Sequence, residues 1–237
     1  MTARDDQATG LRRLFARGAT PVGAIAGTDA DAATVALARA CADVGERVLI
    51  LDRSRGAVAA HAGTRARHEL WHVLEGDATA EMALLRIADD VTLLPAARGL
   101  DLLAAGRDDW RDGVAAALGR FAATFDTWIV HGLPPAATGC ARPIFMVNPT
   151  RAGVTDAYAR IKALAASQGR SRFGIVAARV AESRAGEAMF ASLAATAKRF
   201  LGVELALCGQ WPADGAALDR LRAALAVTDG DDHAAAA

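Results

Sequence analysis

Hydrophobic and polar positions follow one another along the chain in a pattern that predicts strands and helices in turn. An apolar run, Val22 to Ala26, leads through a small-residue turn, Gly27-Thr28-Asp29, into a segment whose apolar residues recur with helical spacing as far as Val44. A β-branched run, Val48 to Leu51, follows and ends on Asp52. A strand, turn, helix and second strand in this order are typical of the opening unit of an α/β fold.

The same alternation continues towards the C-terminus. Further strands are predicted over 91–95, 127–130, 143–147, 173–177 and 203–207, and further helices over 109–121, 154–164, 187–200 and 216–227. Strands that alternate with helices favour a doubly wound, mostly parallel sheet with helices on both faces. We expect a single domain over 19–228, an N-terminal segment over 1–18, and a disordered acidic, alanine-rich tail over 229–237.

Composition excludes several classes of function. The chain has 237 residues, is 53% hydrophobic and carries 27 basic and 27 acidic residues, so it lacks the basic excess of a nucleic-acid-binding protein. No apolar run reaches the length of a membrane span, and the polar N-terminus lacks the apolar centre of a signal peptide. Cys41, Cys140 and Cys208 are too widely spaced for a metal pattern, and we expect buried thiols in a cytoplasmic protein.

The turn after the first strand is where phosphate-binding proteins of this architecture place their chemistry, because backbone N–H groups and a helix N-terminus point at an anion. A working phosphate loop also needs a lysine for the β- and γ-phosphates and a hydroxyl for Mg²⁺. Counted back without gaps from Asp52, with the spacing usual in P-loop proteins of the cell-division-regulator type, these positions fall on Ala30 and Asp31. No other lysine is near, since Lys162 is the first in the chain.

These two changes predict a large loss of affinity for a triphosphate. A charge-assisted hydrogen bond contributes about 1.5–3 kcal/mol, and a carboxylate about 5 Å from a phosphate charge adds about 3 kcal/mol of repulsion at an effective dielectric constant near 20. Together they weaken binding by roughly three to four orders of magnitude. Two alternatives stay open: a βαβ scaffold without a ligand, and weak nucleotide binding through backbone amides near Gly27.

Two short stretches outside this unit carry possible chemistry. His68-Glu69-Leu70-Trp71-His72 formally matches the zinc motif H-E-x-x-H, but it lacks a long helix and a third ligand, and the alternative is a short helix with exposed histidines and a packed tryptophan. Near the N-terminus, Leu11, Leu14 and Phe15 share one helical face. So short a helix must dock on its own domain or on a partner.

The N-terminal stretch Asp6-Gln7-Ala8-Thr9-Gly10-Leu11-Arg12 is similar to the DQAxGLR motif of the FlhG/FleN family, the MinD/ParA-type regulators of flagellar number and placement in bacteria. The resemblance extends over nearly the whole chain. Five further stretches are each similar to a motif of the family. Arg47–Asp52 is similar to the strand that ends in LLLDAD, Leu94–Ala96 to the LLPA turn, and Thr155–Lys162 to the LTDAYxxIK helix. Arg199–Val203 is similar to RFLGV, and Gly209–Asp214 to GxxPxD.

The resemblance implies a binding role for the N-terminal segment. In that family the segment docks on the signal-recognition-type GTPase FlhF and stimulates GTP hydrolysis. The residues carried over are Asp6, Gln7, Ala8, Gly10, Leu11 and Arg12. Flagellar switch proteins and a transcription regulator are further partners that the family implies, and its members attach to membrane, at the cell pole, through a C-terminal helix. Here that helix offers a narrow stripe, Leu218, Leu221 and Leu225, beside an acidic end, so we expect weak or absent membrane contact.

Four elements of the family's nucleotide site depart from its pattern. Both lysines of the KGGxGKT loop are missing, the second aspartate of LDAD is Ser54, the aspartate that helps to hold magnesium is His131, and the asparagine of NRV is Ala178. We therefore expect a vestigial nucleotide site, with no catalytic residue, no metal and no cofactor, and a monomer or a nucleotide-independent dimer. The residues of this site are Gly27, Ala30, Asp31, Asp52 and His131. The alternative is an active MinD-type ATPase that uses ATP and Mg²⁺ to dimerise and to associate with membrane.

Overall fold

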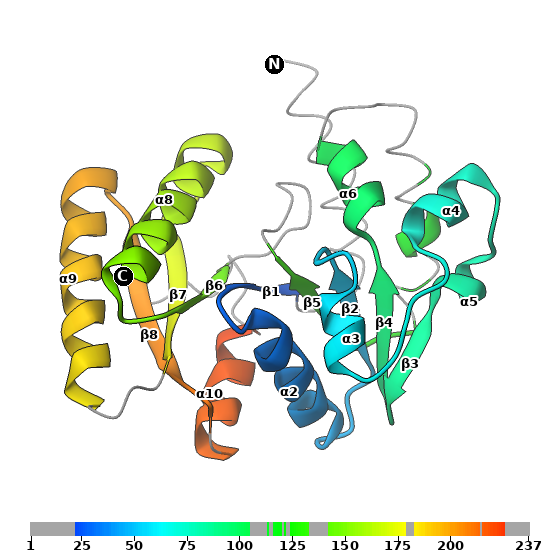
Figure 1. Cartoon of the computed structure of the whole chain (residues 1–237), viewed down its shortest axis with the longest axis horizontal. Helices are drawn as coiled ribbons and strands as arrows, with labels where there is room; N and C mark the ends of the chain where they lie inside the picture. Colours follow the sequence, from blue (N-terminus) through cyan, green and yellow to red (C-terminus); the bar gives the residue numbers. More distant parts are fainter. Residues whose placement is uncertain are drawn as a thin grey trace, which may run out of the picture.

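One sheet of eight strands runs through the part of the chain that the computed structural model describes, with helices on both of its faces (Figure 1). The described residues are 22–104, 113, 116–119, 121, 124–132, 142–178, 183–213 and 215–225. The strand order is β3-β4-β2-β5-β1-β6-β7-β8. Only the β3 and β4 pair at one edge is antiparallel, and every other pair of these neighbours is parallel.

The bounds of the elements follow the predicted alternation. The strands are β1 (Val22–Gly27), β2 (Val48–Asp52), β3 (Leu85–Ala88), β4 (Val91–Pro95), β5 (Thr127–His131), β6 (Ile144–Val147), β7 (Arg172–Ala178) and β8 (Glu204–Trp211). The helices are α2 (Ala30–Ala42), α3 (Ala57–His61), α4 (Leu70–Glu75), α5 (Ala80–Ala83), α6 (Ala97–Ala104), α8 (Arg151–Gln168), α9 (Ser183–Leu201) and α10 (Gly215–Leu225). The predicted doubly wound, mostly parallel α/β fold is confirmed.

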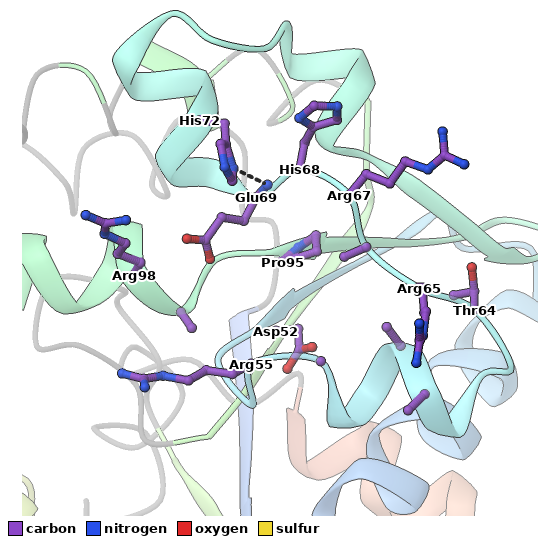
Figure 2. A pocket seen from close by; sticks show the side chains of 15 residues that line it. Asp52, Arg55, Thr64, Arg65, Arg67, His68, Glu69, His72, Pro95 and Arg98 are labelled. Carbon is purple, nitrogen blue, oxygen red and sulfur yellow. Dashed lines mark hydrogen bonds between the residues drawn. The ribbon is translucent and has the colours of Figure 1, made fainter.

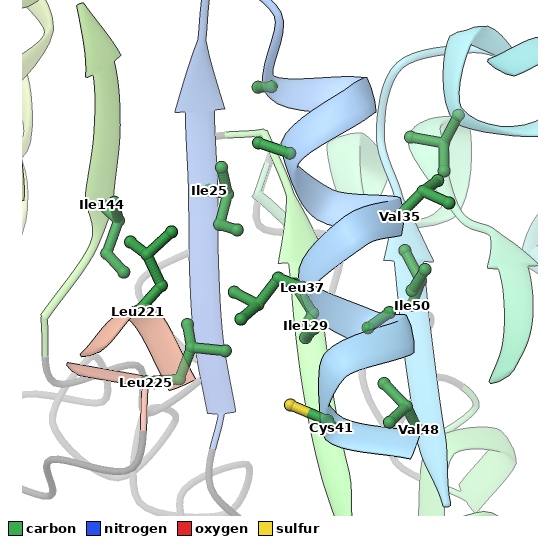
Figure 3. Packing of buried hydrophobic residues seen from close by; sticks show 14 of the residues in the cluster. Ile25, Val35, Leu37, Cys41, Val48, Ile50, Ile129, Ile144, Leu221 and Leu225 are labelled. Atoms are coloured by element: carbon green, nitrogen blue, oxygen red, sulfur yellow. The ribbon is translucent and has the colours of Figure 1, made fainter. Parts of the chain in front are cut away.

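Successive residues of each buried strand point to opposite faces of the sheet, which gives the molecule two apolar layers. On one face, Ile25, Ile50 and Ile129 pack under α2 and α10, as Figure 3 shows. Leu37 of α2 is fully buried in this layer. The sequence run Val48 to Leu51 is apolar throughout because both faces of β2 are covered.

The opposite face of the sheet is covered by two groups of helices. Leu49 and Trp128 pack with Leu70 of α4 and with α6 around one half of this face. Phe145 and Phe173 pack with residues of α8 and α9 around the other half, and their ring centroids are 6.1 Å apart. Covering both faces leaves the strand ends as the place where polar groups can gather.

The C-terminal helix packs on the core with the stripe that the sequence offered as a membrane contact. Leu221 and Leu225 of α10 are 2% and 4% exposed, and both belong to the layer under α2. A Cβ atom at Gly23 of β1 would overlap the Leu225 side chain, so β1 and α10 are in close contact. Within the described residues, no helix has the length and apolar character needed to cross a membrane.

Several predictions are corrected or lie outside the described residues. Strand β3 was not predicted, because its side chains are half-buried or exposed and give no apolar run. Val44 was placed with the helical spacing, but α2 ends at Ala42 and Val44 is 53% exposed. Cys41 and Cys208 are buried free thiols, and burial raises the pKa of Cys41 to about 12. The segment 1–18, Cys140 and the tail 229–237 lie outside the described residues.

Candidate functional site

The carboxyl ends of the central strands bring the candidate residues to one edge of the sheet. Gly27 ends β1, Asp52 ends β2 and His131 ends β5, and Asp52 and His131 are opposite one another in the β2–β5 register. In open α/β sheets, ligands bind outside this edge. Ala178 ends β7, and the Arg179-Val180 pair that follows it lies outside the described residues.

The connection between β1 and α2 is too short for a phosphate loop. A GxxxxGK loop with its lysine position at Ala30 would cover 24–30, but 24–27 belong to β1 and only Thr28 and Asp29 separate the strand from the helix. Asp29 has a left-handed backbone, with φ 56°, which turns the chain within these two residues. Ala30 and Asp31 still stand at the start of α2, as the count back from Asp52 has them, and the loop before them is shortened as well as substituted.

Gly27 has a packing role at this turn. Its φ is 114°, and a Cβ atom there would collide with the carbonyl oxygen of Met146 in β6. Only glycine fits this backbone so close to the next strand. Ala30 is 3% exposed as the first residue of α2, and Asp31 follows it in the first helical turn. Gly27, Ala30 and Asp31 thus form a tight strand-to-helix junction.

His131, which the resemblance aligns with an aspartate, places a buried ring at the end of β5. Its Nδ1 lies 3.1 Å from Oγ1 of Thr34, a residue of α2 that is fully buried. Burial lowers the pKa of His131, while the charges of Asp52 and Asp31 oppose that shift. A ring with a lowered pKa is neutral at neutral pH, so His131 supplies no negative charge for Mg²⁺.

Asp52 is held by the serine that replaces the second aspartate of LDAD. Its Oδ1 accepts hydrogen bonds from the backbone N–H of Ser54 at 2.7 Å and from the Ser54 hydroxyl at 2.5 Å. The Ser54 Oγ in turn accepts from the N–H of Ala57 at 2.8 Å, at the start of α3. The Oδ2 of Asp52 is buried and has no hydrogen-bond partner among the described residues.

These residues do not fit magnesium and a triphosphate in the manner of a phosphate loop. The turn supplies two residues instead of a loop, a carboxylate occupies the hydroxyl position, and His131 is a neutral ring. Within the described ranges, no group of three or more histidine, cysteine, aspartate or glutamate side chains could hold a metal ion.

A hollow of about 750 Å³ lies beside Asp52, at the ends of β2 and β4 (Figure 2). In this view Asp52 lies below Pro95, and the segment with His68, Glu69 and His72 lies above it. The volume of the hollow falls in the range of small-molecule binding sites. The charged and titratable side chains that line it are Asp52, Arg55, Arg65, Arg67, His68, Glu69, His72 and Arg98.

The H-E-x-x-H stretch forms one wall of this hollow and does not have the zinc-motif geometry. His68 and Glu69 precede α4, so the two histidines are not one helical turn apart on a single helix. The Nδ1 of His72 accepts a hydrogen bond from the N–H of Glu69 at 3.1 Å. Both histidines are half-buried, which corrects the expectation that they are exposed, and Trp71 packs under the Arg98 guanidinium at 3.8 Å.

The sequence reasoning missed two structural partners and the arginines of the hollow. Thr34 carries the one hydroxyl group within the apolar stretch from Ala32 to Ala38, and this break in the apolar pattern indicates a buried polar contact at Thr34. The alignment treats Ser54 as a missing aspartate and does not predict that its hydroxyl donates a hydrogen bond to Asp52. The partner-binding residues of the N-terminal motif lie outside the described residues, so the structure does not place them.

Comparison with known proteins places the chain in a family. It is 30% identical over 190 residues, which are 76% of this chain and 68% of the relative, to the antiactivator FleN of Pseudomonas aeruginosa. A plasmid partition protein from Borrelia burgdorferi has a similar structure, with a TM-score of 0.60 at 11% identity, over 87% of this chain and 96% of that one. A Borrelia burgdorferi plasmid partition protein bound to AMPPNP has a TM-score of 0.58 at 11% identity, over 86% of this chain and 97% of that one.

No model of a known protein family matches the chain. The two Borrelia structures establish the fold, and the Pseudomonas relative establishes the family. The resemblance read from the sequence motifs is thereby confirmed. The chain belongs to the FleN family of flagellar regulators, with the ParA/MinD type of P-loop fold.

Proposed function

We propose that this protein regulates flagellar placement, number and assembly as a binding platform that does not hydrolyse ATP. Membership in the FleN family supports the flagellar role. The observation that carries the non-catalytic part is the junction between β1 and α2, where two residues stand in place of a phosphate loop. Such a protein works by presenting surfaces to partners, in the cytoplasm and at the cell pole.

The energetics of the junction support this proposal. A phosphate loop binds through several backbone N–H groups together with its lysine, and here both contributions are reduced. The missing lysine and the added Asp31 alone weaken triphosphate binding by roughly three to four orders of magnitude. The shortened connection removes further N–H donors, so the proposed protein does not depend on ATP and acts as a monomer or a nucleotide-independent dimer.

The proposed partner is a GTPase of the FlhF type, bound through the N-terminal motif. Gln7, Leu11 and Arg12 keep the family's motif although the nucleotide site has changed. In this proposal the segment orders the catalytic water of the GTPase, or Arg12 lies near the phosphate charge that develops during hydrolysis. The name antiactivator, given to the Pseudomonas relative, also supports a transcription regulator as a second partner.

One preparation of the full-length chain tests both parts of the proposal. Calorimetric titration with ATP and Mg²⁺ is expected to give no micromolar affinity. GTP hydrolysis by the partner GTPase is expected to rise when the chain is added, and to return to its basal rate when residues 1–18 are deleted. Arg12→Ala should reduce the stimulation, and Arg4→Ala, which removes a charge from the same segment outside the motif, is the matched control.

The competing function is a working ATPase, and the AMPPNP bound to a Borrelia protein of the same fold is the observation that favours it. Micromolar affinity for ATP together with ATP-dependent dimerisation would establish it and refute the platform proposal. If deletion of residues 1–18 left GTPase stimulation unchanged, the assignment of the N-terminal motif would be wrong, whatever the result with ATP.

A further inference from the structure

The C-terminal end of α9 carries an exposed phenylalanine beside two unpaired cations. Phe200 is 66% exposed, the highest value among the large hydrophobic side chains of the described residues. The guanidinium carbon of Arg199 lies 5.2 Å from the centroid of its ring. Lys198 and Arg199 are exposed, and neither forms an ion pair with a carboxylate of the described chain. Glu204, the nearest acidic residue in sequence, lies 3.8 Å from Arg172 instead. We call Lys198, Arg199 and Phe200 the basic patch.

The residues that follow Phe200 have structural roles that Phe200 lacks. Gly202 ends α9 with a left-handed backbone, at φ 67°, and donates its N–H to the Lys198 carbonyl at 3.2 Å. Val203 is 2% exposed and belongs to the apolar layer under α8 and α9, and Leu201 packs against that layer. Single exposed apolar side chains are common on protein surfaces, so a complementary feature is needed to identify a partner for Phe200.

A surface of opposite charge lies on α4 and α5, which are in contact with each other. Met82 of α5 is 52% exposed. Glu75 and Asp77, at the end of α4 and in the turn that follows, are exposed and form no ion pair within the described chain. No lysine or arginine occurs over 73–85. We call Glu75, Asp77 and Met82 the acidic patch, which again joins unpaired charges to an exposed apolar side chain.

The two patches lie at opposite ends of the protein. Helix α9 packs on β8, and α5 leads into β3, and these are the two edge strands of the described sheet. Figure 1 accordingly shows α9 and α5 at the two ends of the longest axis. The patches of one copy therefore cannot reach each other, and only a second copy can bring them together.

We propose that the basic patch of one copy of this chain binds the acidic patch of a second copy, head to tail. The cations of one patch meet the carboxylates of the other, and the Phe200 ring packs against the Met82 thioether. Complementary charge around an apolar centre selects the partner and its orientation. The contact is heterologous, so each copy keeps one patch free for a further copy. It does not rest on the proposed flagellar role and needs no nucleotide.

The size of the patches makes this a weak, salt-dependent contact. Each patch contributes two unpaired charges and one large apolar side chain, so we expect a Kd of about 100 µM at 0.1 M salt. When salt is raised to 1 M, the Debye length falls from about 10 Å to about 3 Å. The Kd should then rise at least about tenfold, because exposed charges carry most of the attraction.

Sedimentation velocity on the full-length chain, at concentrations on both sides of this Kd, tests the proposal. We expect the mean mass to rise with concentration at low salt, with or without Mg-ATP. Lys198→Glu/Arg199→Glu makes both patches acidic, and Glu75→Lys/Asp77→Lys makes both basic, so each variant alone should stay monomeric. A mixture of the two variants should associate again, which also shows that both are folded. Phe200→Ala should weaken association about two- to tenfold.

The matched control is Arg39→Glu/Arg220→Glu, which reverses two exposed cations on α2 and α10 and changes the net charge by the same amount as the basic-patch variant. It should associate like the unmodified chain. The proposal is overturned if the mass does not rise with concentration, if association requires Mg-ATP or persists at 1 M salt, or if either patch variant still associates alone. It is also overturned if the mixture stays monomeric, or if the control loses association as the patch variants do.

Discussion

Acid destabilisation of the fold should reveal that His131 is held in its neutral form. The side chain is 7% exposed, its Nδ1 lies 3.1 Å from Thr34 Oγ1, and burial lowers its pKa despite the nearby charges of Asp52 and Asp31. In the unfolded chain a histidine takes up its proton at about pH 6.5. Protonation therefore favours the unfolded state, so the stabilisation is complete above about pH 6.5 and is lost as the pH falls towards the pKa of the folded state.

The size of this effect follows from the number of protons involved. One histidine changes the free energy of unfolding by at most about 1.4 kcal/mol per pH unit. Between pH 7.5 and 5.5, a histidine that stays neutral in the folded state contributes a loss of at most about 1.4 kcal/mol, because the unfolded chain is protonated over only part of that range. The carboxyl of Asp126 does not interfere, since Arg47 holds its pKa at about 2.

Urea unfolding at pH 7.5 and at pH 5.5 measures this loss. The variants are His131→Asn, which removes the titration, and His61→Asn, which removes an exposed histidine as the matched control. We expect the unmodified chain and His61→Asn to lose up to about 1.4 kcal/mol more than His131→Asn does. Equal losses in the unmodified chain and in His131→Asn would refute the assignment of a buried neutral ring.

Three substitutions, with Gly169→Ala as the control for the first, test the packing of the fold by urea unfolding. Gly27→Ala should lower the free energy of unfolding by more than about 3 kcal/mol, because it adds a collision with the Met146 carbonyl to an unfavourable φ. Gly169→Ala, at φ 64° with open space around it, should lower it by only about 1–2 kcal/mol. Equal losses would contradict the close approach of β1 and β6. Thr150→Ala should cost about 1 kcal/mol, because the hydroxyl accepts the Gly153 N–H at 3.1 Å at the start of α8. Leu225→Ala should cost about 2–5 kcal/mol by leaving a cavity between α10 and β1, and a cost below about 1 kcal/mol would show that α10 is not docked as described.

The strands and helices could be predicted where burial leaves a local trace. The run Val48 to Leu51 and the stretch 127–130 were identified as strands because a strand covered on both faces is apolar along its whole length. Strand β3 could not be found in this way, since it is paired at the edge and its four residues are only half-buried or exposed. The helix at the C-terminus was predicted, but the protein surface that its leucines cover was not, because an apolar stripe does not identify what it packs against.

Some features of the candidate site could likewise be predicted from the sequence, and others could not. Ala30 stands where the family has a lysine, and His131 stands where it has an aspartate. Each difference concerns a single aligned position, so the sequence and its resemblance to the family were enough to predict it. The length of the β1–α2 turn was not predictable, because a count back from Asp52 to Ala30 does not test the length of the loop that precedes Ala30. The role of Ser54 was not predictable either, because the alignment shows only that a carboxylate is missing and not that the Ser54 hydroxyl donates a hydrogen bond to Asp52.

Local patterns in the chain were enough to establish a parallel α/β fold, the order of its elements and the loss of the phosphate-binding lysine, because each depends on residues that are neighbours in sequence. The Thr34–His131 pair, separated by 97 positions, and the arginine-lined hollow around Asp52 depend on which strands lie next to each other in the sheet. The strand order depends on burying both faces of the sheet at the same time. This burial is a property of the whole folded chain, so no single segment of the sequence predicts it.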